Sequence, residues 1–149
     1  MQDISLEKAQ ELLLREVREI PLSETESVPL LAALGRRLAE DCCAAFDQPP
    51  FNRSPLDGYA LLAACTQEAS ADAPARFRVI GEECAGSLFA GKVGAGEALR
   101  LMTGAAMPEG ADTVVRQEDV SVEGEEILVP YALKHHENIC FRGEGVEKL

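Results

Sequence analysis

The apolar residues nearest the N-terminus recur at intervals of three and four, which is the spacing that gathers them on one face of a helix. This pattern predicts a helix from about Leu6 to Glu19 that is capped by Ser5 and ended by Pro21. A shorter helix is expected from about Pro29 to Leu34, because proline is favoured in a first turn and Gly35 supplies a C-terminal stop. The beginning of the chain is therefore predicted to be helical.

Beyond these helices the apolar residues occur in short runs bounded by Gly, Pro and polar residues, which is typical of strands. Residues 38–46 weakly indicate an extended segment. Seven strands are predicted further on: Tyr59–Leu62, Phe77–Gly81, Ala98–Thr103, Thr113–Gln117, Val120–Val122, Ile127–Val129 and Asn138–Arg142. Glu123-Gly124 is predicted to form the tight turn of a hairpin. Because no helix long enough to be a crossover separates the strands, we do not expect a parallel sheet of the dinucleotide-binding type.

The charge balance narrows the classes of partner. The chain has 26 acidic and 14 basic residues and a formal net charge of −12. A field of this sign repels nucleic acid and anionic lipid, and the sequence has no Lys/Arg cluster to override it. It does not exclude a small phosphorylated substrate, because a few cations or a bound metal reverse the potential locally. No apolar run approaches the ~18 residues of a membrane span, and the N-terminus lacks a secretory signal, so we expect a cytoplasmic protein.

The residues that most often bind metals are poorly spaced for that role. The five cysteines are Cys42, Cys43, Cys65, Cys84 and Cys140. They form no C-x-x-C pair, which favours buried, inert thiols over a disulfide framework or a zinc cluster. His135-His136 is expected to be a surface pair. Gln117-Glu118-Asp119 is expected to be a solvated strand end or a turn rather than a metal site, because consecutive strand residues point to opposite faces. An independent metal-binding protein is therefore the least favoured hypothesis.

The first segment with candidate chemistry is the loop of residues 47–58, which contains three prolines. It cannot be regular structure, because proline removes amide donors and restricts the residue before it. Asp57 has two interpretations: a turn aspartate bonded to its own backbone, or a carboxylate on a rigid loop that binds Mg²⁺ or positions a polar ligand. Asn52, Arg53 and Ser54 would add an amide, a cation and a hydroxyl to the second interpretation.

The second candidate segment is residues 102–112. A predicted strand ends at Thr103, and the small residues that begin at Gly104 let a ligand approach the backbone amides closely. The Thr103 hydroxyl can donate a hydrogen bond to an anionic oxygen. The alternative is a strand-to-turn junction that needs only compactness.

Five ordered blocks of the sequence resemble the start of the molybdopterin molybdenumtransferase family, which includes the E domain of gephyrin and the plant E-domain proteins. The blocks are Ala33-Leu34-Gly35-Arg36 with Leu38-Ala39-Glu40-Asp41; Pro49-Pro50-Phe51-Asn52 with Ser54-Pro55-Leu56-Asp57-Gly58-Tyr59-Ala60; Met102-Thr103-Gly104-Ala105 with Pro108-Glu109-Gly110-Ala111-Asp112; Gln117-Glu118-Asp119; and Asn138-Ile139 with Arg142-Gly143-Glu144. Together they extend over nearly the whole chain.

The resemblance implies an α+β, mainly β fold in two domains. Residues 1–42 with 141–149 would form a discontinuous framework of helix and strand that is helical at its N-terminus, and residues 43–140 a β-rich lobe of irregular, coiled antiparallel sheets. It further implies that the α/β domain that binds most of the substrate is absent from this chain. The subunits are expected to form an elongated homodimer in which the β lobe of one closes over the cleft of the other.

The resemblance also implies a reaction, namely insertion of molybdenum from molybdate into adenylylated molybdopterin with release of AMP in the presence of Mg²⁺. By motif, Asp57 is assigned to Mg²⁺ or substrate positioning and Thr103 to hydrogen-bonding an anionic substrate group. Neither is expected to be a nucleophile, because an incoming oxyanion needs orientation and charge neutralisation. The weaker substrate-binding candidates are Asn52, Arg53, Ser54 and Gly104.

Two functional hypotheses follow. The first is that the chain is part of this transferase and is inactive, or nearly so, by itself. The alternative is a non-catalytic dimerisation or binding module of the same fold, for which exposed apolar loop residues such as Phe51 and Phe89 are suited.

Overall fold

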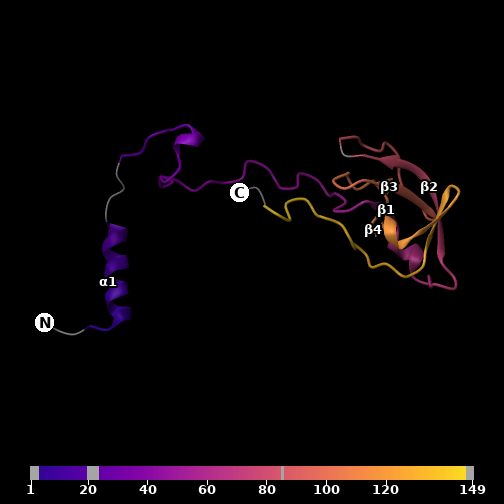
Figure 1. Cartoon of the computed structure of the whole chain (residues 1–149), viewed down its shortest axis with the longest axis horizontal. Coiled ribbons are helices and arrows are strands. Elements are labelled where there is room, and N and C mark those ends of the chain that lie inside the picture. The colour runs from indigo at the N-terminus through magenta and orange to yellow at the C-terminus, as the bar shows by residue number, and fades with distance from the viewer. Residues whose placement is uncertain (1–3, 20–23, 85, 147–149) are drawn as a thin grey trace. The chain divides into compact units, whose positions relative to one another are not determined.

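The computed structural model describes residues 4–19, 24–84 and 86–146 of the chain. Its contacts divide the chain into two compact units, Met1–Cys42 and Cys43–Leu149. Figure 1 shows the helix of the first unit and the strands of the second, coloured by residue number along the chain. In the described residues, no helix combines the length and the apolar character that a bilayer crossing requires.

The first unit contains the predicted long helix, α1, which spans Leu6–Glu19 and confirms the periodicity of the sequence. The Ser5 hydroxyl accepts the amide hydrogen of Lys8 at 3.3 Å, so it caps the first turn as expected. The apolar face of α1 lies open, with Leu6 70% and Leu13 66% exposed. The predicted Pro29–Leu34 helix is shorter than expected, because only the 3₁₀ helix η1, Leu30–Ala32, forms.

The second unit is a curled six-stranded sheet (Figure 1). Its strands are β1 (Gly58–Leu61), β2 (Ala75–Glu83), β3 (Glu97–Leu101), β4 (Thr113–Arg116), β5 (Ser121–Glu123) and β6 (Glu126–Val129). They lie in the order β4-β1-β3-β2-β6-β5. Six of the predicted strands are therefore confirmed in place. The predicted strand at Asn138–Arg142 does not form and contributes only an isolated bridge between Cys140 and Arg53, and residues 38–46 belong to no strand.

The sheet is mixed, which corrects the expectation of antiparallel pairing throughout. β2 and β3 run parallel, with Arg78 opposite Glu97, whereas the other neighbouring strands are antiparallel. Residues 84–96 connect the two parallel strands, which is a connection of the length that such a crossover needs even without a helix. The buried Glu83 holds this connection, because its carboxylate accepts the amide hydrogen of Phe89 at 3.0 Å.

The hairpin between β5 and β6 is confirmed, but its turn lies one residue later than predicted. Glu123 pairs with Glu126, so Gly124 and Glu125 are the two turn residues. Gly124 has a φ of +64°, a left-handed conformation that glycine adopts without the steric cost of a side chain. The position of the glycine, rather than of the acidic residue before it, therefore sets the turn.

Apolar side chains cover both faces of the sheet. Tyr59, Phe77 and Val115 belong to a cluster on one face, and Leu99 and Leu101 to a cluster on the other. All four residues of β1 are buried, so this strand runs through the middle of the core. Burial of each large apolar side chain stabilises the fold by roughly 1.5–3 kcal/mol. The residues that enter and leave β1 are consequently held on a rigid base.

The outer edge of β4 is covered by the irregular segment that was predicted to be a strand. The amide of Val114 donates to the carbonyl of Glu137 at 3.0 Å, and the Asn138 side-chain amide donates to the carbonyl of Val114 at 2.8 Å. Asn138 and His136 have positive φ values of 57° and 65°, which are incompatible with an extended strand. The segment thus satisfies an exposed sheet edge without continuing the sheet.

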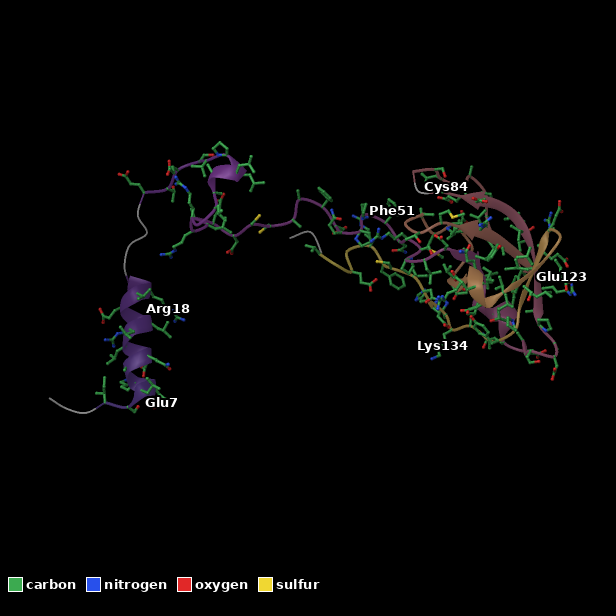
Figure 2. The ribbon with its side chains drawn as sticks, in the orientation of Figure 1. Glu7, Arg18, Phe51, Cys84, Glu123 and Lys134 are labelled. Atoms are coloured by element: carbon green, nitrogen blue, oxygen red, sulfur yellow. The ribbon has the colours of Figure 1, made fainter. Side chains whose placement is uncertain are left out.

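The cysteines differ from the expectation of buried thiols. Cys42, Cys43 and Cys84 are exposed, and Cys65 and Cys140 are half-buried. Cys84 follows the last residue of β2, where the chain leaves the sheet (Figure 2). Free cysteine behaves as a small hydrophobe, which had suggested burial, but all five of these residues lie outside the strands β1–β6 that build the core.

Candidate functional site

The proline-rich loop and the Met-Thr-Gly-Ala segment lie side by side as an extension of the β1–β3 pair. Gly58 pairs with Leu101 in the sheet, and Arg53 pairs with Ala106 in an isolated bridge five positions further along each segment. Both pairs therefore share one antiparallel register. Between them, the Gly104 amide donates to the Ser54 carbonyl and the Ser54 amide to the Ala105 carbonyl, each at 2.9 Å. These backbone bonds fix the two candidate segments against each other.

A third segment lies on the opposite edge of the loop. The amide of Arg53 donates to the Cys140 carbonyl at 2.9 Å, and the Cys140 amide donates back to the Arg53 carbonyl at 3.0 Å. The Arg142 amide donates to Oδ1 of Asn52 at 2.9 Å. Three blocks that are remote in the sequence, around residues 52–57, 103–107 and 140–142, are thus brought together in one place.

Residues 141–146, which were predicted to belong to the N-terminal framework, meet the beginning of the second unit. The amide of Gly143 donates to the Pro49 carbonyl at 3.0 Å, and the amides of Gly145 and Val146 both donate to the Gln48 carbonyl. The discontinuous domain division stays a prediction.

Asp57 and Thr103 are in direct contact at the centre of this arrangement. Oδ1 of Asp57 accepts two hydrogen bonds of 2.7 Å each, one from the Thr103 amide and one from the Thr103 hydroxyl. No hydrogen bond to Oδ2 is formed by the described residues. Asp57 is partly exposed and Thr103 is exposed, so the free carboxylate oxygen is accessible from solvent.

The same contacts set the charge of the carboxylate. The hydrogen bonds from the Thr103 hydroxyl and then from its amide hold the pKa of Asp57 below its usual value, and the positive charge of Arg100 acts in the same direction. Asp57 is therefore ionised at neutral pH. Because a carboxylate only accepts hydrogen bonds, the single proton of the Thr103 hydroxyl is directed at Asp57. Its predicted donation to a substrate anion would have to compete with this bond, and that role stays a prediction.

Two neighbouring residues shape the turn that carries Asp57. Ser54 is fully buried, and its hydroxyl donates to the Leu56 carbonyl at 2.5 Å. Gly58 follows Asp57 and passes so close to β4 that a Cβ there would lie 2.1 Å from the carbonyl oxygen of Val115. The Asp-Gly pair of the sequence thus reflects a close backbone approach at glycine. The carboxylate before it is consequently held in one place.

The weaker candidates are placed differently from one another. Ser54 is buried and Asn52 accepts the amide of Arg142, while the Gly104 amide is bonded to the backbone and its φ is +88°. Arg53 is exposed, and among the described residues its guanidinium forms neither an ion pair nor a hydrogen bond. Arginine 100, which lies in β3 opposite Tyr59, was missed by the sequence analysis. Only the strand register identifies it as a neighbour of Asp57.

An open depression of about 750 Å³ lies beside the three segments. Its lining residues come from the proline-rich loop, from residues 106–111, from the 84–96 connection and from the C-terminal segment, and include Phe51, Leu88, Met107 and Arg142. Phe51, labelled in Figure 2, is 46% exposed on the loop that leads into β1. The surface next to the candidate residues is therefore largely apolar.

The other polar motifs form local contacts. His135 is exposed as expected, and its Nδ1 lies 3.0 Å from Oδ2 of Asp112. Asp119 accepts a hydrogen bond of 3.2 Å from the hydroxyl of Tyr131. In the described part of the chain, no group of three or more His, Cys, Asp or Glu side chains converges in a manner suited to a metal ion.

Comparison with known proteins decides the family. The family model described as the MoeA N-terminal region (domain I and II) matches residues 4–148. This chain belongs to the MoeA N-terminal family. The match spans both structural units and all of the segments that surround Asp57 and Thr103.

Relatives of the MoeA family support the same assignment. The chain is 43% identical over 127 residues to the molybdopterin molybdenumtransferase of Bacillus subtilis, covering 83% of this chain and 30% of the relative. It is 38% identical over 121 residues to the enzyme of that name from Staphylococcus epidermidis, covering 81% and 29%. A crystal structure of the molybdopterin biosynthesis MoeA protein from Pyrococcus horikoshii OT3 matches with a TM-score of 0.82 and 39% identity, over 99% of this chain and 38% of that one. The chain thus spans less than a third of the length of these curated relatives.

Proposed function

We propose that this chain is the N-terminal part of a transferase that inserts molybdenum from molybdate into adenylylated molybdopterin and releases AMP. The observation that carries the proposal is the Asp57 carboxylate, which is ionised, fixed through Oδ1 by Thr103 and open to solvent at Oδ2. The names of the MoeA relatives support the reaction class. A β lobe that presents a fixed carboxylate suits a cleft completed by a domain outside residues 1–149.

The carboxylate has the chemistry that a Mg²⁺ site of this kind needs. Mg²⁺ is usually held by one or two carboxylates together with waters and substrate phosphates rather than by a cage of protein ligands. Asp57 fits the role of a single protein ligand, because its Oδ2 is free and its negative charge is retained. When bound, the ion would neutralise charge on the phosphate and the incoming oxyanion. In this proposal Asp57 and Thr103 bind and orient, and neither acts as a nucleophile.

We assign the neighbouring groups to positioning Asp57. The Thr103 amide and hydroxyl fix one oxygen, which leaves the other oxygen of Asp57 for a ligand. Ser54 closes the turn before Asp57. Asn52 and Gly104 join the loop to its two neighbouring segments. Such support matters because a binding group must be held within fractions of an ångström of its productive position.

The proposal includes a homodimer. The first unit exposes several large apolar side chains, among them Leu31 at 96% and Leu34 at 95%. Exposed apolar surface of this kind is typical of a face that another chain or domain covers. The same observation supports the alternative, a non-catalytic dimerisation or binding module. Sedimentation of the isolated chain tests that alternative, which a monomer without pterin binding would contradict.

The experiment for the proposed reaction measures molybdate-dependent AMP release by the full natural chain. Wild type is compared with Asp57→Asn, which preserves the size of the side chain and removes its charge. The matched control is Asp72→Asn, in an exposed loop of the second unit. We expect a loss on the order of 100-fold for Asp57→Asn and none for the control. Unchanged turnover in Asp57→Asn would remove Asp57 from the mechanism.

A further inference from the structure

Burial along the proline-rich loop alternates, and this assigns its side chains to two faces. Ser54 is fully buried, and Leu56 packs against the cluster that contains Leu99 and Leu101. On the paired segment, Ala105 and Met107 meet the same cluster. By contrast, Arg53 and Pro55 are exposed and Asp57 is partly exposed, so these three residues lie on the solvent side of the loop.

The backbone of Arg53 is held from both sides. Its amide and carbonyl are bonded to Cys140, and the residue also forms a bridge with Ala106. The neighbours Asn52 and Ser54 bond in turn to the segment of Ala106. Because these contacts hold the backbone of Arg53 in place, its side chain can sample only one region of the surface.

The guanidinium of Arg53 differs from the other arginines of the second unit. The remaining five each pair with a carboxylate: Arg76, Arg78, Arg100, Arg116 and Arg142. Within residues 43–84 and 86–146, Arg53 is the arginine that lacks such a partner. The chain has 26 acidic residues and a net charge of −12, so carboxylates are plentiful. An unpaired guanidinium on a backbone that is held in place is available to an external anion.

We propose that Arg53 binds a tetrahedral oxyanion, either the phosphate of the nucleotide or molybdate, on the same face as Asp57. This inference rests on the proposed function, which supplies the anionic substrate. Arg53 is held by Cys140 and Ala106, whereas Asp57 is bonded to Thr103, so the two side chains would meet different groups of one extended ligand. The planar fork of arginine donates two parallel hydrogen bonds to an oxyanion, which lysine cannot reproduce. Arg53 is therefore a substrate-binding residue and Asp57 a metal-binding one.

The test uses the full natural chain and three substitutions. Arg53→Gln removes the charge, Arg53→Lys keeps the charge but loses the fork, and Arg76→Gln removes an arginine that is paired with Glu123 and Glu126 at the β5–β6 hairpin. Dissociation constants for AMP and for molybdate are measured separately, together with KM and kcat for AMP release. Thermal unfolding midpoints confirm that each variant is folded, which is expected because the Arg53 side chain is exposed and unpaired.

We expect Arg53→Gln to weaken binding of one of the two probes about tenfold or more, with kcat changed less than threefold. The affinity of Arg53→Lys for that probe is expected to lie between those of Arg53→Gln and wild type, and the affinity of Arg76→Gln to equal that of wild type. Weakened AMP binding identifies the phosphate as the ligand, and weakened molybdate binding identifies molybdate. Wild-type affinity of Arg53→Gln for both probes would overturn the inference.

The outcome for Arg53 is separable from that of the proposed function. If Asp57→Asn loses AMP release while Arg53→Gln keeps wild-type affinity and KM, the assignment of Arg53 fails and the proposed function stands. If the wild-type chain itself shows no molybdate-dependent AMP release, the proposed function fails, and the assignment of a substrate anion to Arg53 fails with it.

Discussion

Asp57 and Thr103 are joined through a single carboxylate oxygen, which accepts both the amide and the hydroxyl hydrogen of the threonine at 2.7 Å. The two residues are separated by 46 positions in the sequence. The two residues therefore have different roles. Thr103 uses its donors on Asp57, while Asp57 retains a second oxygen for a ligand.

The pair makes the ionisation of Asp57 sensitive to residue 103. Thr103→Val removes the hydroxyl, which is the largest contribution to the lowered pKa of Asp57, and keeps the shape of the side chain. We expect the pKa of Asp57 to rise toward its usual value in Thr103→Val and to stay low in Thr103→Ser, which keeps the donor. Titration of the side-chain carboxyl resonance by NMR measures this. An unchanged pKa in Thr103→Val would show that the hydroxyl does not hold the carboxylate.

The same pair links stability to pH with a defined sign. The folded-state pKa of Asp57 is lowered, so its contribution to stability is present above the unfolded pKa and is lost as the pH falls through the folded one. The difference in unfolding midpoint between wild type and Thr103→Val is therefore expected at neutral pH and absent at strongly acidic pH. Thermal unfolding at both pH values measures it, and a difference that persists in acid would contradict the account.

Gly58 is predicted to be the most sensitive glycine near the site. In Gly58→Ala the new Cβ would lie 2.1 Å from the Val115 carbonyl oxygen, which forces β1 away from β4. Gly81→Ala is the control, because its Cβ would meet Leu99 at an ordinary 3.4 Å. We expect a loss of about 3 kcal/mol or more in the free energy of unfolding for Gly58→Ala and less than about 1 kcal/mol for the control. Denaturant unfolding measures both, and equal losses would contradict the close approach.

Tyr131 is predicted to titrate late. Burial, followed by the hydrogen bond to Asp119, raises the pKa of Tyr131 to about 12. Because the folded pKa is raised, the associated stability is present below the unfolded value and is lost as the pH rises through the folded one. Asp119→Asn removes the acceptor charge and should lower the pKa of Tyr131. Ultraviolet titration of the phenolate, with Tyr59→Phe to isolate the signal of Tyr131, measures the change; titration near 10 in wild type would contradict it.

Local patterns predicted the elements that depend on neighbouring residues. The α1 helix follows from its own periodicity and its Ser5 cap, and six strands follow from short apolar runs. The parallel pairing of β2 and β3 was not predicted, because it depends on the path of residues 84–96 through contacts such as that of Glu83 with Phe89. Asn138–Arg142 failed as a strand because a positive φ at Asn138 is not visible in an apolar pattern.

The candidate site shows the same limit. The family motifs identified Asp57 and Thr103 as separate positions, but nothing in the sequence shows that they bond to each other across 46 residues. Sequence alone also grouped Ser54 with Arg53. Burial distinguishes them, because Ser54 is fully buried in its turn whereas Arg53 is exposed and unpaired. Which of these residues contact each other, and which are buried, depends on the pairing of remote segments, and a single sequence does not show that pairing.

The central claim is that Asp57 meets the ligand and that Thr103 acts through Asp57. A double-mutant cycle on kcat/KM for molybdate-dependent AMP release tests it most directly, using Asp57→Asn, Thr103→Val and the double variant of the full natural chain. The account predicts that the double variant is no slower than Asp57→Asn alone, because the threonine has no separate role to lose. Losses that multiply would show that Thr103 contacts the substrate independently and would contradict the account.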